Sequence, residues 1–473
     1  MTRRAKIVCT IGPATATAER IAGLAEAGMD VARLNFSHGS HADHEAVYAM
    51  VRRASEETGR AIGVLADLQG PKIRLGKFEN GSTVWNTGDR VIITSQDVLG
   101  TPTRVGVTYR KLPAEVRVGN RLLVDDGKLV LEVVDVVDDD IACLVVEGGP
   151  VSDHKGLSLP NVNISVPALS EKDTDDLRFA LELGADMIAL SFVRSPEDIK
   201  PVHAIMSDMD ARRPVLAKIE KPEAVERLDD IVAAFDGIMV ARGDLGVELP
   251  LEQVPLVQKR CVQLCRENAK PVIVATQMLD SMISNARPTR AETSDVANAV
   301  LDGADAVMLS GETSVGKYPL DTVRTMASIV ATTEGGEFTP PRLEHDPKTQ
   351  GGAITHAASR VARAVDAKAL VAFSQTGDTV RRLSRLHCPL PLLAFTPDEK
   401  TRCQLALSWG VDSHLVEFVD HTDEMFQQVD EAVLGLGAAQ MGDLVVIVAG
   451  SPPGTPGSTN TLRVHRVGLA ERG

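Results

Sequence analysis

The chain has 473 residues, a length that predicts two to four domains instead of a single core. Its formal net charge of −15 argues against a nucleic-acid partner, which would require a basic surface. No apolar run approaches the roughly 20 residues of a membrane-spanning helix, and the first residues lack the apolar stretch of a signal peptide. We therefore expect a cytoplasmic protein that binds neither nucleic acid nor membrane.

In chain order, short apolar runs alternate with helical patterns, which include residues 17–27, 41–58, 252–268 and 289–301. The apolar runs have the composition of parallel strands that are buried on both faces. They occupy residues 6–11, 30–36, 61–68, 186–192, 214–220, 237–241, 271–276 and 305–310. Eight such strands with intervening helices predict a (β/α)8 barrel, the TIM-barrel architecture.

This alternation is interrupted after the third strand. Short alternating strands at residues 90–94, 121–124, 129–137 and 141–147 replace the helices, and a helical pattern returns at residues 170–183. The interruption predicts a small β domain inserted after the third barrel strand.

A Gly- and Pro-rich linker follows residue 332, and α/β alternation then resumes and predicts a separate open sheet. Its helices are expected at residues 353–365, 379–386 and 398–407, and its strands at 369–373, 390–395, 443–448 and 462–467. The predicted domains are a catalytic barrel at 1–69 and 167–335, the β domain at 70–166 and a C-terminal α/β domain at 345–473.

Polar residues follow most of the predicted barrel strands. In barrels of this class the active site lies at the carboxyl ends of the strands, so these residues are expected to converge on one rim. They are Asn35, Ser37, Asp67, Lys218, Glu220, Arg242, Asp244, Thr276, Ser310 and Glu312.

Glu220 and Asp244 end neighbouring strands, and a carboxylate pair in that position is a natural Mg²⁺ site that substrate and water complete. Lys218 lies two residues before Glu220, so in a strand both side chains share one face. A fixed ammonium beside a divalent cation suits the charge of a phosphoryl group in transfer. The residues alone leave open a structural Lys–Glu ion pair that bridges two strands.

Two further patterns suggest sites of other kinds. The segment from Gly311 to Lys317 has P-loop spacing, but Tyr318 replaces the Mg²⁺-binding hydroxyl residue. The spacing of His38, His41 and His44 is that of one helical face, and we expect solvated histidines there instead of a metal cluster.

Six segments resemble pyruvate kinase, and the resemblance extends over nearly the whole chain. They are TIGP at residues 10–13, ARLNFSHG at 32–39, KIEK at 218–221, MVARGDLG at 239–246, ATQMLDSM at 275–282 and MLSGET at 308–313. The resemblance implies transfer of a phosphoryl group from phosphoenolpyruvate to ADP, which gives pyruvate and ATP in glycolysis. It also implies a homotetramer, and it implies that the inserted β domain is a small β-barrel that acts as a lid.

The resemblance assigns roles to the rim residues. Glu220 and Asp244 would bind Mg²⁺ or Mn²⁺, and Lys218 would stabilise the phosphoryl group in flight. Arg33 would hold the phosphoryl side, and the Gly243 backbone with Asp244 and Thr276 would hold the pyruvate end. The candidate proton donor to the enolate is Thr276, or a water near Ser310 and Glu312. The nucleotide phosphates would meet Asn35, His38, Arg74 and Lys155 as the β domain closes.

One departure from the family pattern concerns K⁺. Members that need K⁺ carry Thr, Lys and Glu where this chain has Leu68, Gln69 and Lys72. The pocket for the monovalent cation is intact and consists of Asn35, Ser37 and Asp67. Because the Lys72 ammonium can supply the missing positive charge, we expect the enzyme to work without K⁺, as the K⁺-independent branch does.

In the C-terminal domain, Ser374, Thr376, Gly377 and Thr379 follow a strand and open a helix, a pattern typical of a phosphate nest. An ordinary capped helix start is equally compatible with it. In the family the equivalent loop binds a phosphorylated effector. The second effector loop, residues 450–460, lacks the Trp and Arg of members that respond to fructose 1,6-bisphosphate, so we expect a monophosphate such as glucose 6-phosphate or AMP.

Two other functions use part of the same pattern. A Mg²⁺-dependent aldolase acting on pyruvate enolate would share the carboxylate pair, but it would need neither Lys218 nor a lid. A non-catalytic metabolite sensor would keep the C-terminal domain, but it would have no use for an intact Lys218, Glu220, Asp244 and Thr276.

Overall fold

The computed structural model describes residues 3–160, 162, 164–344, 346–419, 421–451 and 457–468. Its central part is a closed barrel of eight parallel strands, in the order β1-β16-β15-β14-β13-β12-β3-β2. The strands are β1 (Lys6–Thr10), β2 (Val31–Asn35), β3 (Gly63–Asp67), β12 (Met187–Leu190), β13 (Val215–Ile219), β14 (Gly237–Ala241), β15 (Val272–Ala275) and β16 (Ala306–Leu309). The predicted TIM barrel is confirmed.

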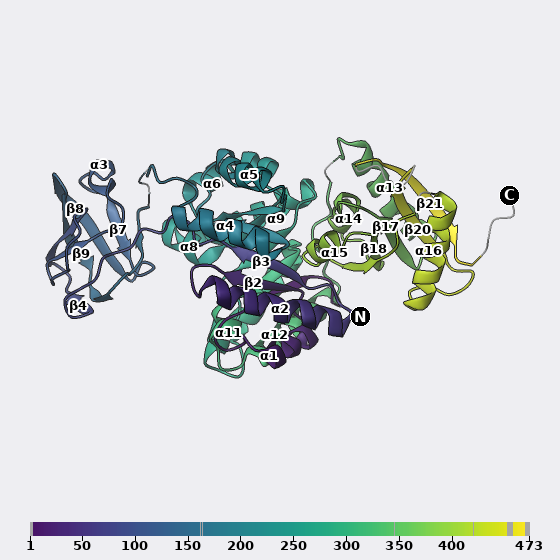
Figure 1. Ribbon diagram of the computed structural model, residues 1–473, viewed down its shortest axis with the longest axis horizontal. Coiled ribbons are helices and arrows are strands. Elements are labelled where there is room, and N and C mark those ends of the chain that lie inside the picture. Colours follow the sequence, from purple (N-terminus) through teal and green to yellow (C-terminus); the bar gives the residue numbers. More distant parts are fainter. Residues whose placement is uncertain are drawn as a thin grey trace.

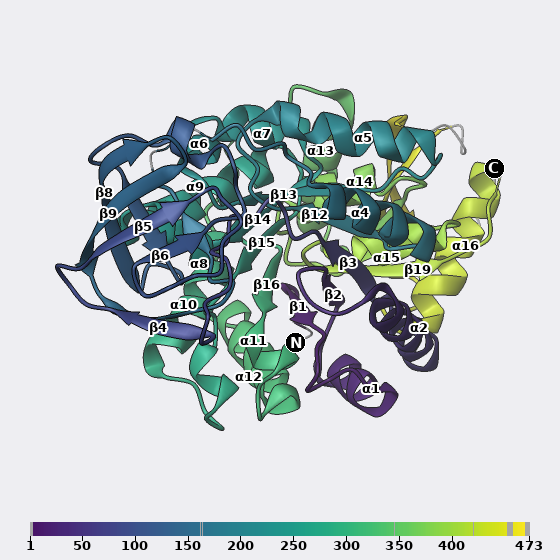
Figure 2. The ribbon, with the colours of Figure 1, turned by 60° about the vertical axis from the view of Figure 1, so that its left-hand side comes forward.

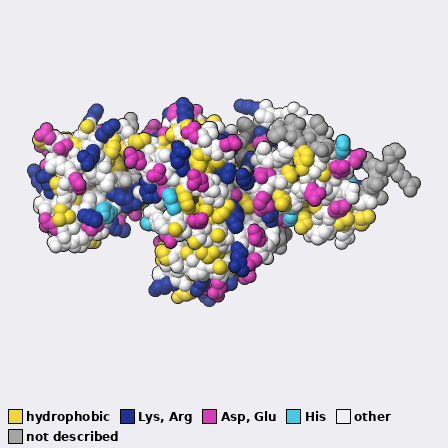
Figure 3. All heavy atoms as spheres, viewed as in Figure 1, with side chains coloured by type: hydrophobic (Ala, Val, Ile, Leu, Met, Phe, Trp, Pro, Cys, Tyr) yellow, Lys and Arg dark blue, Asp and Glu magenta, His cyan; other side chains and the backbone are white. Residues whose placement is uncertain are grey.

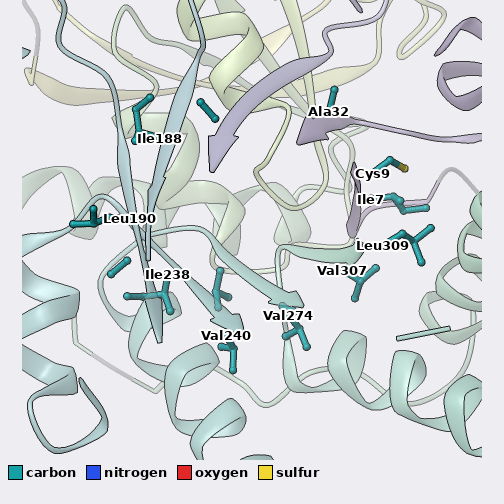
Figure 4. Close-up of a cluster of buried hydrophobic side chains, with 14 of the residues drawn as sticks. Ile7, Cys9, Ala32, Ile188, Leu190, Ile238, Val240, Val274, Val307 and Leu309 are labelled. Atoms are coloured by element: carbon teal, nitrogen blue, oxygen red, sulfur yellow. The ribbon is translucent and has the colours of Figure 1, made fainter. Parts of the chain in front are cut away.

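Helices cover the barrel because each strand alternates between an inward and an outward side chain. Ile7 and Cys9 of β1 and Val307 and Leu309 of β16 lie on the helix-facing side, in one buried cluster (Figure 4). The main covering helices are α1 (Ala18–Ala27), α2 (His41–Thr58), α4 (Glu171–Leu183), α5 (Ile199–Asp208), α7 (Leu228–Ala234), α9 (Val254–Glu267), α10 (Arg290–Asp302) and α12 (Pro319–Glu334). Further short helical segments are α6 (Pro222–Glu226), α8 (Arg242–Glu248), α11 (Gly311–Ser314), η1 (Pro196–Asp198), η2 (Leu251–Gln253) and η3 (Asp280–Ile283).

The helix limits follow local chemistry. Ser40 and Asp43 form a capping box that starts α2, and Gly59 ends the helix in the left-handed conformation at φ 66°. Within the part of the chain that the structure describes, no helix combines the length and apolar character needed to cross a membrane.

The inserted segment lies at one end of the molecule (Figure 1). Where a small barrel was expected, six strands form one sheet in the order β11-β7-β8-β9-β5-β6, and β10 pairs separately with β4. Register shifts in the β8–β9 ladder bend the sheet around its own hydrophobic core. The elements are β4 (Ser82–Trp85), β5 (Arg90–Thr94), β6 (Arg104–Gly106), α3 (Leu112–Glu115), β7 (Arg121–Val124), β8 (Leu129–Val137), β9 (Asp140–Glu147), β10 (Gly149–Ser152) and β11 (Leu157–Ser158).

The C-terminal part lies at the opposite end and contains an open five-stranded sheet, β19-β18-β17-β20-β21, with β21 antiparallel (Figure 1). Its strands are β17 (Ala369–Phe373), β18 (Leu392–Thr396), β19 (Val411–Leu415), β20 (Leu444–Gly450) and β21 (Thr459–Arg466). Its helices are α13 (Gln350–Ala364), α14 (Asp378–Ser384), α15 (Glu399–Leu405) and α16 (Thr422–Gly435). Strand β19 and helix α16 were not predicted from the sequence.

The C-terminal part closes the amino ends of the barrel strands. Ala406 and Leu407 share a buried cluster with barrel residues such as Val8, Leu65 and Met308. The β domain is attached after β3, and turning the molecule brings it in front of the barrel (Figure 2). Acidic and basic side chains are interspersed over all three parts on the face shown in Figure 3. Because the C-terminal part covers the amino ends of the barrel strands, the carboxyl ends are the ends that remain available for an active site.

Candidate active site

The centre of the rim is the ammonium of Lys218, near the end of β13. Its Nζ lies 2.9 Å from Glu220 Oε1 and 3.3 Å from Asp67 Oδ1, and it donates to Ser191 Oγ at 2.7 Å. Burial alone would lower the pKa of Lys218, but the Asp67 and Glu220 carboxylates raise it above its ordinary value. The Lys–Glu pair therefore belongs to a charged cluster, and it does not bridge two strands, because Lys218 lies in β13 and Glu220 directly follows that strand.

Arg33 of β2 completes the cationic side of this cluster. Its Nε lies 2.7 Å from Asp67 Oδ2, and one Nη donates to Thr10 Oγ1 at 2.9 Å. Burial opposes ionisation of Asp67, yet Lys218 and Arg33 together hold its pKa below the ordinary range. Asp67, predicted as a ligand of the monovalent cation, thus forms ion pairs with two cationic side chains, Arg33 and Lys218, in this structure.

Glu220 and Asp244 form the predicted carboxylate pair. Glu220 is 1% exposed, and its Oε2 accepts a hydrogen bond from Phe192 N at 2.8 Å. Burial raises the pKa of Glu220, and the nearby Asp244 raises it further. Asp244 lies in the first turn of α8, which begins where β14 ends. Among the described residues no group of three or more His, Cys, Asp or Glu side chains could hold a metal, so an ion here would need further ligands from substrate and water.

Thr276 follows β15 in a strained conformation. Its φ is 67° and that of Gln277 is 53°, values that non-glycine residues adopt at a cost. Thr276 Oγ1 accepts from Gly243 N at 2.7 Å and donates to Ala275 O at 2.6 Å. The contact joins the ends of β14 and β15 and brings together two residues predicted to hold the pyruvate end.

Arg242 supports the Thr276 loop and does not join the Lys218 cluster. Its guanidinium donates to Thr276 O at 2.7 Å and to Ala275 O at 3.2 Å, and it pairs with Asp295 of α10 at 2.7 Å. Arg242 was placed on the predicted rim beside Asp244, but its contacts make it a support of the backbone.

Glu312 has a comparable backbone role. It is 1% exposed and accepts from Ser310 N at 2.7 Å and from Leu279 N at 3.1 Å. These bonds fasten the loop after β15 to the loop after β16, and burial raises the Glu312 pKa. Ser310 Oγ is buried and, among the described residues, makes no hydrogen bond.

The residues predicted to bind nucleotide come from both sides of the domain junction. Arg74 donates to His154 O at 3.1 Å, and Lys155 pairs with Asp125 at 2.8 Å, all within the β domain. On the barrel, Asn35 Oδ1 accepts from Ser37 N at 3.2 Å, and Asn35 O accepts from His38 N at 3.1 Å. The two groups make no direct contact in the interactions of the described residues.

Lys72 lies at the junction between the β domain and the barrel. Its Cε would lie 3.0 Å from a Cβ added at Gly156 of the β domain. It lines a hollow that is also lined by Phe192, Lys221 and Asp244. Lys72 therefore faces the same region of the barrel mouth as Asp244.

Two of the three histidines after β2 have structural partners, whereas the third, His38, is exposed. His41 pairs with Asp176 at 2.8 Å, and its ring stacks on Phe179. His44 is only 8% exposed, because it stacks on Phe36 with ring centres 4.3 Å apart. The prediction of solvated histidines is thus wrong for His44, since the helical face it shares turns toward the barrel.

The predicted effector loop lines a hollow in the C-terminal part. Ser374, Thr376 and Thr379 line it together with Thr459, and the Thr379 and Thr459 hydroxyls lie 2.6 Å apart. Gly377, at φ 77°, starts α14 without a side-chain cap. Residues 452–456 of the second predicted loop lie outside the described residues.

Sequence reasoning missed the corner after β12. Ser191 and Phe192 contact Lys218 and Glu220, although no rim residue was assigned to this strand. The signal was available, because Ser191 is a polar residue that ends an apolar strand, as the assigned rim residues are.

Comparisons with known proteins cover almost the entire chain. A family model described as pyruvate kinase, barrel domain, matches residues 2–323, and one described as pyruvate kinase, alpha/beta domain, matches residues 352–465. A pyruvate kinase from Mycobacterium intracellulare is 63% identical over 468 residues, 99% of each chain. One from Corynebacterium efficiens is 63% identical over 470 residues, which is 99% of this chain and 98% of the relative. A solved pyruvate kinase from Cryptosporidium parvum has a TM-score of 0.91 at 34% identity, over 98% of this chain and 96% of that one.

Proposed function

The chain belongs to the pyruvate kinase family, and from that premise we propose how the residues of its barrel mouth carry out the reaction. It is a phosphotransferase that moves the phosphoryl group of phosphoenolpyruvate to ADP, giving pyruvate and ATP. The observation that carries the site assignment is the convergence of Lys218, Arg33 and Asp67 beside the Glu220–Asp244 pair. The relatives named above are pyruvate kinases, which favours this function over the aldolase and sensor alternatives.

The family requires a divalent metal, and we propose Glu220 and Asp244 as the residues that hold it, as Mg²⁺ or Mn²⁺. The two hard carboxylates fit such an ion, because the positive charge of a bound dication would relieve their mutual repulsion. When bound, the ion supplies Lewis-acid stabilisation to the enolate oxygen and the phosphoryl group.

Lys218 and Arg33 supply the cationic contacts for the phosphoryl group in this proposal. Both side chains are held in place by neighbouring residues. Lys218 contacts Ser191 and Asp67, and Arg33 contacts Thr10 and Asp67. Fixed cations in a site that excludes water stabilise developing negative charge without first having to reorganise.

Thr276 is the proposed proton donor to the enolate carbon, and with the Gly243 backbone and Asp244 it holds the pyruvate end. Its hydroxyl proton is directed to Ala275 O in this structure, so donation requires rotation of that O–H toward the substrate. Ser310, whose hydroxyl is buried and unbonded among the described residues, would hold a water for the alternative route beside Glu312.

Closure of the β domain would bring Arg74 and Lys155 toward Asn35 and His38 of the barrel. Support comes from the attachment of the β domain immediately beside the barrel mouth, where both parts line one hollow. A closed lid would contribute cations to the nucleotide phosphates and would exclude water that could hydrolyse the phosphoryl donor.

K⁺ independence remains our proposal for the monovalent site of Asn35, Ser37 and Asp67. Two observations support it, the position of Lys72 at the barrel mouth and the existing contacts of Asp67 with Lys218 and Arg33. We also propose a phosphorylated effector, glucose 6-phosphate or AMP, at residues 374–379, a homotetramer, and a cytoplasmic location suited to glycolysis.

A coupled assay with lactate dehydrogenase and NADH tests the reaction and the K⁺ proposal together. Phosphoenolpyruvate, ADP and Mg²⁺ should give turnover in buffer free of Na⁺ and K⁺, and added KCl should change it little. A many-fold rise with KCl would refute K⁺ independence, and absence of turnover in both buffers would refute the function.

Lys218→Met tests the site assignment. Phosphoryl transfer should be abolished, whereas exchange of the pyruvate methyl protons with D₂O should persist in part because Thr276 is untouched. Lys200→Met, which changes an exposed lysine of α5, is the matched control and should keep full activity. Unchanged transfer in Lys218→Met would refute the assigned role.

A further inference from the structure

The corner Ser191–Phe192 after β12 contacts both central groups of the site. Ser191 Oγ lies 2.7 Å from Lys218 Nζ, and Phe192 N donates to Glu220 Oε2 at 2.8 Å. Ser191 is 2% exposed, so water does not compete freely for its hydroxyl. The corner is therefore placed to influence both the phosphoryl-binding ammonium and the proposed metal ligand.

The direction of the Ser191 hydrogen bonds is determined by its partners. Its hydroxyl lies 2.7 Å from Leu68 O, which can only accept, so the serine proton points to that carbonyl. The Lys218 ammonium can only donate, so it must use a lone pair of the serine oxygen. Ser191 therefore acts as a fixed acceptor, held by the backbone that follows β3.

Ser191 differs in charge from the other partners of Lys218. Asp67 and Glu220 are carboxylates with a second partner each, since Asp67 pairs with Arg33 at 2.7 Å and Glu220 is a proposed metal ligand. The serine is the neutral side-chain acceptor among the described contacts of Lys218 Nζ. It can orient the ammonium without cancelling the positive charge that a phosphoryl group needs.

We propose that Ser191 is a positioning residue for phosphoryl transfer, whose hydroxyl holds the Lys218 ammonium in place and leaves its charge to the phosphoryl group. This inference rests on the proposed role of Lys218. It adds a neutral anchor that does not depend on what the two carboxylates bind during the reaction.

The backbone of the corner is held firmly enough to act as an anchor. Phe192 has φ 55°, a strained value that its N–H bond to Glu220 helps to hold. Gly70 packs directly against the corner, because a Cβ there would lie 2.6 Å from the Phe192 ring and 2.8 Å from Ser191 Cβ. Close packing on one side and the Leu68 carbonyl on the other leave the Ser191 side chain little room to move.

Ser191→Ala removes the anchor and should lower kcat for phosphoryl transfer roughly 10- to 100-fold, the effect of losing one hydrogen bond to a charged group. KM for phosphoenolpyruvate should change little, because the contact matters most when charge develops. Exchange of pyruvate methyl protons in D₂O, followed by proton NMR, should stay close to wild type. Ser191→Thr keeps the hydroxyl and should recover most of the lost kcat.

Ser195→Ala, four residues along the same loop, is the control for general damage and should behave as wild type. Thermal unfolding midpoints are compared for all variants. Wild-type kcat in Ser191→Ala, or an equal loss of transfer and exchange in that variant, would each overturn the inference, as would failure of a Ser191→Thr enzyme with a wild-type unfolding midpoint to recover activity. Inactivity of the wild-type enzyme would overturn the proposed function itself, whereas an inert Lys218→Met beside a fully active Ser191→Ala would overturn only the role of Ser191.

Discussion

Arg242→Ala tests whether catalysis depends on the strained loop that carries Thr276. The guanidinium donates to Ala275 O at 3.2 Å and to Thr276 O at 2.7 Å. A hydrogen bond from a charged donor contributes about 1.5–3 kcal/mol, so the two together contribute about 3–6 kcal/mol. The left-handed backbone at Thr276 and Gln277 costs about 1–3 kcal/mol per residue, or about 2–6 kcal/mol in all. Because the two sums are comparable, loss of Arg242 should let the loop relax.

Relaxation would move Thr276 Oγ1 away from its 2.7 Å contact with Gly243 N. A displacement of about 1 Å at a reacting group can lower a rate about 100-fold, and we expect a fall of that size in kcat. The coupled assay measures kcat and KM, and NMR in D₂O measures proton exchange into pyruvate. Both rates should fall together, unlike in Lys218→Met, because the proton donor itself is displaced.

The controls separate the carbonyl contacts from the ion pair. Asp295→Asn keeps the arginine and its bonds to the two carbonyls, so it should retain most of the activity. Arg242→Lys cannot make the same forked contacts and should resemble Arg242→Ala. A folded Arg242→Ala enzyme with wild-type proton exchange would refute the reasoning, since Thr276 would then hold its position without the guanidinium.

Three further predictions concern the metal, K⁺ and pH. Asp244→Asn removes one of the two proposed charged metal ligands. The Mg²⁺ concentration that gives half-maximal activity should therefore rise at least about tenfold. An unchanged Mg²⁺ titration would exclude Asp244 as a ligand. Lys72→Glu should make activity rise at least about tenfold with KCl if closure of the β domain brings residue 72 within about 4 Å of the monovalent site, because exchanging an ammonium for a carboxylate at that distance changes a cation's binding energy by more than about 1 kcal/mol. The same flat response to KCl as wild type would contradict this. Burial raises the pKa of Asp305 to about 6 from 3.8, so between these values the folded chain binds more protons than the unfolded chain. Stability should therefore fall by up to about 3 kcal/mol as pH rises through that window. Chemical unfolding should show this slope in wild type but not in Asp305→Asn, and identical slopes would contradict the assignment.

The sequence alone determined the architecture and predicted which residues gather at the barrel mouth. Continuous apolar runs with helices between them are sufficient for a parallel barrel, because such strands must be covered on both faces. The period of two in a strand placed Lys218 and Glu220 on one face, and the structure has them 2.9 Å apart. Strand β19, with its alternating polar residues, and the shortest strands of the β domain (β4, β6, β10 and β11) escaped prediction because they lack that continuous apolar pattern.

Tertiary structure decided which neighbours each rim residue has. Arg242 and Asp244 are two residues apart, yet the helix that begins at Arg242 directs one toward Asp295 and leaves the other beside Glu220. The contact of Ser191 with Lys218 joins β12 to β13 through the order and register of the barrel, which no local pattern encodes. Local spacing thus specifies which side chains share a face, whereas closure of the barrel specifies which faces meet.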